Sequence, residues 1–197
     1  PLTMATQANS DVGAGTSGLR AFNILSGTIS SQYTLTLPNA PFDVEGLSRD
    51  GMRLLLAASY GGMRVVDITD LGSMSQLATS GSTLGRVHGV AAAPTGYAYL
   101  AGEQGGLLVY QIQAGSPMTL TWRNTLLTTG TAYDAAGTDR FAYVADFSYG
   151  LDIVDLLAPG GPTLVSPPAT FFFQGTSVAL AGPLAIVGDF SGFVRVL

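Results

Sequence analysis

The feature of this sequence that most constrains its fold is a repeat with a period close to 44 residues. A glycine followed by a short apolar segment occurs five times, and the intervals between these glycines are 44, 44, 44 and 42 residues. The repeated glycines are Gly18, Gly62, Gly106, Gly150 and Gly192. Such a period with strand-like content is typical of a β-propeller, in which each repeat forms one blade of four antiparallel strands. We therefore predict an all-β propeller, with residues 1–197 in a single domain.

The repeat around Gly150 shows the expected blade most clearly. Strands are predicted at 133–136 (YDAA), 141–145 (FAYVA) and 151–156 (LDIVDL), with a fourth near 163–166 after a Pro/Gly-rich break. Nearly continuous apolar runs indicate strands that are covered on both faces, as blades are by their neighbours. The glycine is expected to supply a positive φ in the turn between the second and third strands.

The first and last repeats are incomplete. The sequence opens on a second strand at 2–6 and ends within a third strand after Gly192, so about four and a half to five blades are present. Five complete blades of 44 residues need 220 residues, more than the 197 given. Either five blades close with one gap or the chain is part of a larger ring. We favour part of a longer chain, because an open ring leaves unpaired strand edges.

Composition excludes several classes of function. No run of 18 apolar residues occurs, so this segment is not expected to span a membrane. The net charge is −5 and the eight basic residues, all arginine, are scattered, which argues against a nucleic-acid partner. The absence of cysteine excludes disulfides, thiol catalysis, cysteine-bound zinc and iron–sulfur clusters.

Acidic residues mark the turns between second and third strands. Glu103, Asp146 and Asp189 are predicted at equivalent positions on one face of the propeller, with Ser59 in the second repeat. A ring of carboxylates there could hold Ca²⁺ or a basic partner. Turn capping of backbone amides is the favoured alternative, because no dense DxDxDG-type loop is present. No cofactor is therefore expected.

The same face is expected to carry exposed aromatic residues. Phe147, Tyr149 and Phe190 lie in the predicted turns, where burial does not explain them as readily as in strands. The predicted contact surface therefore comprises Phe147, Tyr149, Phe190, Asp146, Asp189 and Glu103. The polar segment Gln7–Ser17 is either a further contact loop or a tolerated insertion.

Residues near the starts of the first strands complete this face: Asp43, His88, Tyr133, Asp134 and Thr176. His88 is the single histidine, and a structural imidazole is favoured over a general base or metal ligand. No GxSxG elbow accompanies it. Asp67 and Asp155, which follow third strands, are expected to bond turn amides.

The strings AYVADFSYGLDIVDL and YAYLAGEQGGLLVYQI resemble the LVIVD repeat, with Asp67 and Asp155 closing third strands. Asn23 and Gln111 stand where that pattern has Asp. The resemblance implies a propeller and, since the repeat is common in bacterial and archaeal surface and secreted proteins, an extracellular or cell-surface location. The family has no shared catalytic motif, so the resemblance implies no activity.

Three functions remain open. The leading one is a non-catalytic structural or binding module that holds a protein, a glycan or other subunits of an assembly. The second is a hydrolase or lyase with its active site at the central channel. The third is an intracellular assembly scaffold. The first is favoured because the sequence contains no recognisable catalytic constellation.

Overall fold

The computed structural model describes residues 2–7, 18–25, 28–38, 43–46, 53–57, 60–81, 85–93, 95–165 and 173–197. These residues form five antiparallel sheets, each built from strands that are consecutive in the chain. We number the sheets as blades 1 to 5 in chain order. Blade 1 contains β1 (Leu2–Gln7), β2 (Gly18–Leu25) and β3 (Thr28–Thr36), and blade 2 contains β4 (Asp43–Gly46), β5 (Arg53–Ala57), β6 (Met63–Asp67) and β7 (Ser75–Thr79). Blade 3 contains β8 (Val87–Ala92), β9 (Tyr97–Gly102), β10 (Gly106–Gln113) and β11 (Thr119–Leu126). Blade 4 contains β12 (Ala132–Gly137), β13 (Phe141–Asp146), β14 (Gly150–Asp155) and β15 (Thr163–Leu164), and blade 5 contains β16 (Gly175–Ala181), β17 (Leu184–Asp189) and β18 (Val194–Val196).

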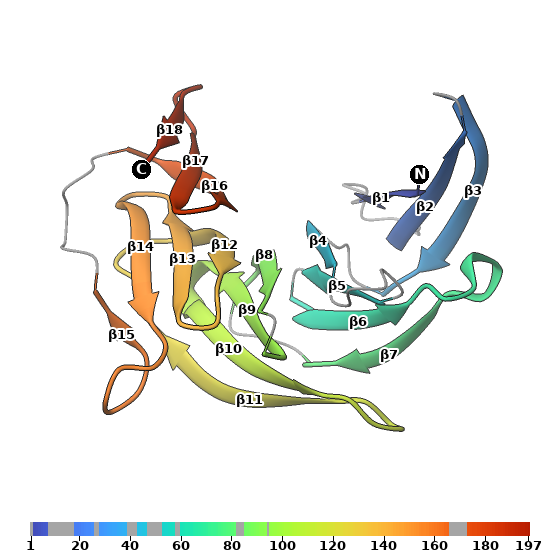
Figure 1. Cartoon of the computed structure of the whole chain (residues 1–197), viewed down its shortest axis with the longest axis horizontal. Coiled ribbons are helices and arrows are strands. Elements are labelled where there is room, and N and C mark those ends of the chain that lie inside the picture. Colours follow the sequence, from blue (N-terminus) through green and yellow to red (C-terminus); the bar gives the residue numbers. More distant parts are fainter. Residues whose placement is uncertain are drawn as a thin grey trace.

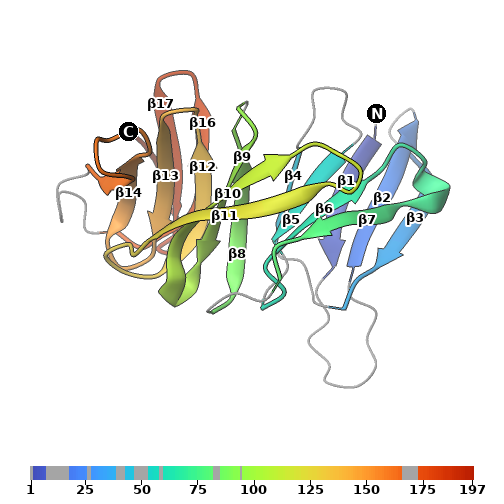
Figure 2. The ribbon, with the colours of Figure 1, turned by 90° about the horizontal axis from the view of Figure 1, so that it is seen from below.

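The all-β propeller predicted from the repeat is confirmed. The blades follow one another around an open arc, with blades 1 and 5 standing apart at its two ends (Figure 1). Blade 1 has three strands, which correspond to the second to fourth strands of a blade, and blade 5 has the first three. Seen from below, the sheets succeed one another along the molecule, with blade 5 and blade 1 at opposite ends (Figure 2).

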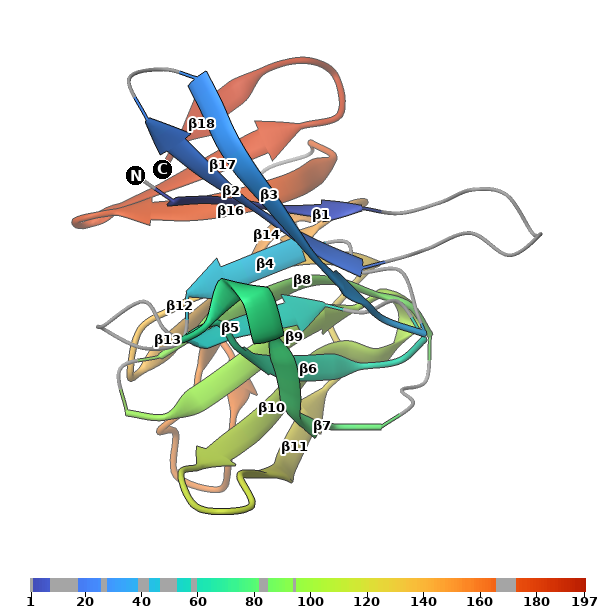
Figure 3. The ribbon, with the colours of Figure 1, turned by 90° about the vertical axis from the view of Figure 1, so that its right-hand side faces the viewer.

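The core lies between the blades rather than within one layer. Val144 is fully buried in a cluster that joins blades 3 and 4, together with Tyr99 and Val109 of blade 3. The neighbouring residues Tyr143 and Ile153 are half-buried. In Figure 3 the long strands β2 and β3 are inclined to β4–β6, so the blades meet at an angle. Such a fold depends on apolar residues on both faces of its sheets.

Four of the five repeated glycines adopt the positive φ expected of them, with values from 68° to 89°. At Gly106 a Cβ atom would lie 2.3 Å from the carbonyl oxygen of Leu126, so a side chain is excluded by space as well as by φ. Gly18 is needed for a different reason, because a Cβ there would lie 2.0 Å from the carbonyl oxygen of Leu35.

Candidate functional site

One face of the propeller is shaped by a bulge at the start of three inner strands. The register of β8, β12 and β16 shifts between Val87 and Gly89, between Ala132 and Asp134, and between Gly175 and Ser177. A bulge of this kind inserts one extra residue and re-aims its side chain. The residues inserted in blades 3, 4 and 5 are His88, Tyr133 and Thr176.

The turns between the second and third strands meet these bulges. The backbone amides of Glu103, Phe147 and Phe190 donate to the carbonyl oxygens of Arg86, Thr131 and Gln174, at 3.0, 2.9 and 2.8 Å respectively. These three residues therefore occupy equivalent positions in blades 3, 4 and 5. This corrects the predicted equivalence of Glu103 with Asp146 and Asp189, because Glu103 aligns with the two phenylalanines that follow those aspartates.

Aromatic rings from the bulges and turns form a continuous row. His88 stacks on Tyr133 with ring centroids 5.0 Å apart and an interplanar angle of 17°. Tyr133 contacts Phe147 at 5.3 Å, and Phe147 meets Phe190 edge to face at 5.6 Å. At the other end, His88 Nε2 lies 2.9 Å from Glu103 Oε1. We call His88, Tyr133, Phe147 and Phe190 the aromatic arc.

The aromatic arc is most open at its blade 5 end. Phe190 is 71% exposed, whereas the His88 side chain is 19% exposed. Tyr133 and Phe147 are half-buried between these ends. Contacts between such rings contribute about 0.5–1.5 kcal/mol each beyond the area that they bury. The arc is thus held together by its own contacts while it still presents apolar surface to solvent.

Beyond Glu103, the arc continues toward blade 2 through a cation–π contact. The Arg86 guanidinium lies 5.5 Å from the centre of the Tyr60 ring, and Arg86 Nε donates to the Tyr60 hydroxyl at 3.3 Å. The hydrogen bond to Tyr60 and the charge of Glu103 raise the pKa of Arg86. Aromatic and charged groups from four blades therefore lie next to one another on this face.

A polar pocket adjoins the arc between the turns of blades 4 and 5. It has a volume of about 340 Å³, and its lining residues are Ser148, Phe173, Gln174, Asp189, Ser191 and Arg195. Arg195 Nε and Nη2 donate to Asp189 Oδ2 at 3.1 and 2.9 Å. The Arg195 guanidinium also lies 4.6 Å from the centre of the Phe173 ring. The pocket thus presents both donors and acceptors beside the exposed Phe190.

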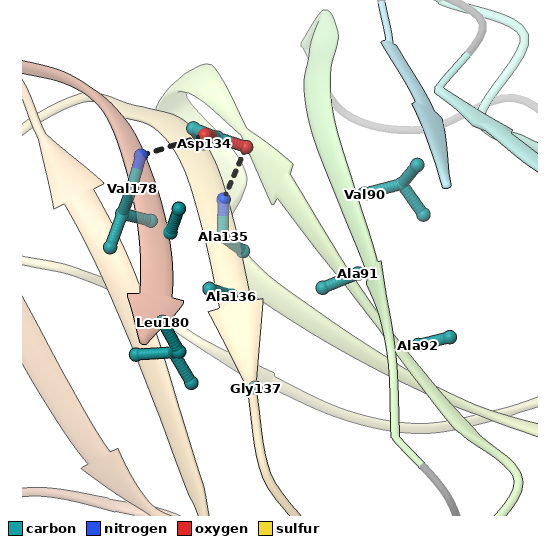
Figure 4. Close-up of a pocket in the computed structure, with 10 residues that line it drawn as sticks. Val90, Ala91, Ala92, Asp134, Ala135, Ala136, Gly137, Val178 and Leu180 are labelled. Carbon is teal, nitrogen blue, oxygen red and sulfur yellow. Dashed lines mark hydrogen bonds between the residues drawn. The ribbon is translucent and has the colours of Figure 1, made fainter. Parts of the chain in front are cut away.

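The centre of the propeller contains a cavity of a different character. Residues 90–92, 134–137 and 178–180 of β8, β12 and β16 line a volume of about 370 Å³ (Figure 4). Asp134 is the one ionisable residue in this lining. Its carboxylate accepts hydrogen bonds from the amides of Ala135 and Val178, both at 2.8 Å, and so ties blade 4 to blade 5.

The two turn aspartates are buried and differ in environment. Asp146 accepts a hydrogen bond from the Gly130 amide at 2.7 Å, and it faces Asp152. Burial is the largest cause that raises the pKa of Asp146 to about 6, and Asp152 raises it further. The pKa of Asp189 is lowered, first by the Ser191 amide and also by Arg195.

The predicted contact residues therefore separate into two groups. Phe147 and Phe190 belong to the aromatic arc, and Glu103 lies at its end against His88. Tyr149 is 40% exposed. Asp146 and Asp189 are 0% and 6% exposed, so in contrast to the prediction their carboxylates do not lie on the surface.

The other predicted positions have simpler outcomes. Asp67 and Asp155 bond turn amides as expected, to Thr69 at 2.8 Å and Leu157 at 3.0 Å. Residues 8–17 and Ser59 lie outside the described residues, and the side chain of Asp43 is also not described. Within the described part of the chain, no group of three or more His, Asp or Glu side chains is placed to hold a metal.

Sequence reasoning missed three features of this face. The contact between His88 and Tyr133 was signalled by their spacing of one repeat, since both were expected at first-strand starts. The pairing of Arg86 with Tyr60 had no comparable signal. The third feature is the position two residues after the turn glycine. It carries a charged residue in three repeats, namely Arg20, Arg64 and Asp152.

Comparisons with known proteins agree with the β-propeller fold. Residues 129–170, which include all of blade 4, match the LVIVD repeat model. The structure is similar to the β-propeller domain of Cps50 (Swd1) from Myceliophteria thermophila, with a TM-score of 0.71 and 10% sequence identity. The alignment covers 91% of this chain and 63% of that domain. At this identity the likeness concerns the fold alone. A search of curated proteins gives no match. In the described residues, no helix has the length and apolarity that a membrane crossing needs.

Proposed function

For a β-propeller that carries an LVIVD repeat, we propose a non-catalytic binding role in which the ligand, a protein or glycan, lies across the aromatic arc. The observation that carries this proposal is the row of four rings from three blades on one face. Loops held by a rigid scaffold are common sites of binding, and exposed aromatic groups are frequent anchors. The proposed location is extracellular or at the cell surface, as the resemblance to the LVIVD repeat suggests.

A glycan is the better match to the polar pocket beside Phe190. A sugar ring has an apolar face that stacks on an aromatic ring, and hydroxyl groups that both donate and accept. Arg195 and Gln174 supply donors, while Gln174 and Ser191 supply acceptors, in a pocket lined by both chain neighbours of the 71% exposed Phe190. A few placed polar groups beside apolar surface are typical of small-ligand sites.

The composition of the central cavity supports the non-catalytic proposal. Apart from Asp134 its lining residues are Val, Ala, Gly and Leu, and the carboxylate of Asp134 receives two backbone amides. Acid–base or nucleophilic chemistry needs several polar groups that converge. A hydrolase or lyase at the channel is therefore the less favoured alternative, and an assembly scaffold would use the same arc to bind a subunit.

Binding to immobilised neutral and acidic oligosaccharides, and to a displayed random-peptide library, tests the proposal. We expect the protein to retain a neutral oligosaccharide, and Phe190→Ala to weaken that binding at least tenfold. Trp122→Ala is the matched control, because Trp122 is 57% exposed on the outer strand β11, away from the arc. Retention of a peptide instead, with the same sensitivity to Phe190→Ala, would assign a protein ligand. Equal losses for both variants, or binding that neither affects, would contradict a site on the arc.

A further inference from the structure

Two carboxyl groups are buried side by side where blade 4 receives the chain from blade 3. Asp146 ends β13 and Asp152 lies on β14, and they are 0% and 5% exposed. In the register of these strands Asp146 pairs with Gly150 and Val144 with Asp152. The two carboxyl groups therefore lie on the same face of the blade as diagonal neighbours.

Each carboxyl group holds the connection between β11 and β12. Asp146 Oδ2 accepts from the Gly130 amide at 2.7 Å, and Asp152 Oδ2 accepts from the Thr129 amide at 3.1 Å. The Asp146 Oδ1 and Thr128 Oγ1 atoms are buried and neither makes a hydrogen bond of good geometry, although the Asp146 carboxyl group lies within reach of both Asp152 and the Thr128 hydroxyl. A buried polar atom without a partner is costly, so two of them at one place indicate that a group is needed there.

The same position in blade 5 shows which kind of group is needed. Val187 pairs with Arg195 as Val144 pairs with Asp152, so Arg195 occupies the place of Asp152. In blade 5 the arginine neutralises Asp189 directly. In blade 4 a second carboxyl group stands there, and both carboxyl groups are buried. In blade 5 the positive charge that balances Asp189 comes from Arg195. The equivalent residue in blade 4 is Asp152, which does not supply a positive charge.

We propose that Asp146, Asp152 and Thr128 bind a small hard cation, such as Ca²⁺, that takes the place of the arginine of blade 5. The donor atoms of this site are carboxylate and hydroxyl oxygens, which are the ligands that hard cations prefer. The site is distinct from a ring of carboxylates across the turns, because it lies within one blade.

A cation at this site would also support the aromatic arc. It would lock residues 128–130 onto blade 4, and the next residue, Thr131, accepts the hydrogen bond from the Phe147 amide. Tyr133 follows two residues later and contacts Phe147. The connection is tightly fitted, because a Cβ at Gly130 would lie 2.2 Å from Asp146 Oδ1 and 2.8 Å from Tyr149 Cδ2. Ligand binding at the arc is therefore expected to be coupled to the cation, although the cation site does not depend on the proposed function.

Thermal unfolding of the chain after removal of metals with a chelator tests the proposal. At pH 7.5 and constant ionic strength, CaCl₂ is expected to raise the Tm by several degrees and to saturate, as binding to the native state alone requires. Calorimetric titration with CaCl₂ is expected to give one site per chain. Asp152→Asn keeps an acceptor for Thr129 but removes a charge, and we expect it to abolish the rise. Asp155→Asn is the matched control on the same strand, where Arg140 is the partner, and we expect the rise to remain.

Several results would overturn the proposal. A wild-type Tm that CaCl₂, MgCl₂ and NaCl leave unchanged would show that the carboxyl pair shares a proton instead. Equal rises in the wild type and Asp152→Asn would place the cation elsewhere. Should Asp152→Asn fail to fold, Thr128→Val removes one ligand without changing a charge, and unchanged Ca²⁺ affinity in that variant would equally contradict the site.

Discussion

Blades 4 and 5 solve the same structural problem with opposite charges. In each blade the second strand ends with a buried aspartate, Asp146 or Asp189. A residue of the third strand faces this aspartate across the pair of strands. In blade 5 the facing residue is Arg195, and the pKa of Asp189 is lowered. In blade 4 it is Asp152, and the pKa of Asp146 is raised to about 6.

The comparison shows that the same residue at equivalent positions of two blades can contribute differently to the free energy of unfolding. Both aspartates look alike in the sequence, yet their contribution to stability depends on one position in the next strand. A buried ion pair with good geometry offsets part of its desolvation, whereas two like charges add to it. Blade 4 is therefore where we expect the propeller to depend on conditions such as pH or cations.

The largest expected effect comes from adding a carboxylate at equivalent core positions. Val144 and Val187 are both fully buried, but Val144 pairs with Asp152 and Val187 pairs with Arg195. Val144→Asp should lower the free energy of unfolding by about 3 kcal/mol or more, since it adds a third charge of the same sign. Val187→Asp should cost clearly less, because Arg195 can pair with it. Urea denaturation of both variants checks this, and equal losses would contradict the comparison.

The second effect is a pH dependence of stability that differs between the two blades. Asp146 binds its proton more tightly in the folded state than at the ordinary pKa of 3.8, so its contribution to stability is lost as pH rises from about 4 through 6. A pKa shift of this size changes the free energy of unfolding by about 3 kcal/mol at most. Asp189 and Asp155 have lowered pKa values, so their contributions are lost as pH falls below about 4.

These opposite signs predict a maximum of the Tm near pH 4–5 in chelator-treated buffer. Melting curves from pH 2 to pH 8 measure it by circular dichroism. Asp146→Asn should remove the decline above the maximum and keep the rise below it. A wild-type profile that rises steadily to pH 8 would show that Asp146 does not hold its proton in the folded state.

Much of the fold could be predicted because blade strands leave a strong local signal. The predicted strand at 133–136 lies within β12 (Ala132–Gly137), and the predicted strand at 141–145 lies within β13 (Phe141–Asp146). Apolar runs covered on both faces and turn glycines with positive φ are properties of a few adjacent residues. The period of the repeat then assembles them into blades without knowledge of long-range contacts.

The candidate site was predicted only in part because it depends on contacts between blades. Phe147 and Phe190 were expected on the turn face, but their contact with each other and with Tyr133 joins separate strands. The alignment of Glu103 with Phe147 was present in the spacing, as each lies three residues before its turn glycine. The acidic side chain suggested a different alignment. The inward direction of Asp146 follows from strand register, which a single sequence does not specify.

The third effect is a gain in stability when the like charge of blade 4 is removed. In chelator-treated buffer at pH 8, Asp152→Asn should raise the free energy of unfolding by about 1 kcal/mol, because repulsion disappears while the bond from Thr129 keeps an acceptor. The pKa of Asp146, followed by NMR, should fall toward its ordinary value. Arg195→Gln makes the reciprocal change in blade 5 and should destabilise the protein. A loss of stability in both variants would mean that Asp152 acts mainly through its hydrogen bonds.

The smallest expected effect compares the equivalent aromatic residues of the two blades. Phe190 is 71% exposed and makes one ring contact, so Phe190→Ala should lower the free energy of unfolding by only about 0.5 kcal/mol, the low end for such a contact. Phe147 is half-buried between Tyr133 and Phe190, and Phe147→Ala should cost about 1–2 kcal/mol through two lost ring contacts. Urea denaturation separates these values. A Phe190→Ala variant as destabilised as Phe147→Ala would show that the arc exists mainly to hold blades 4 and 5 together, whereas the expected difference leaves Phe190 available to a ligand.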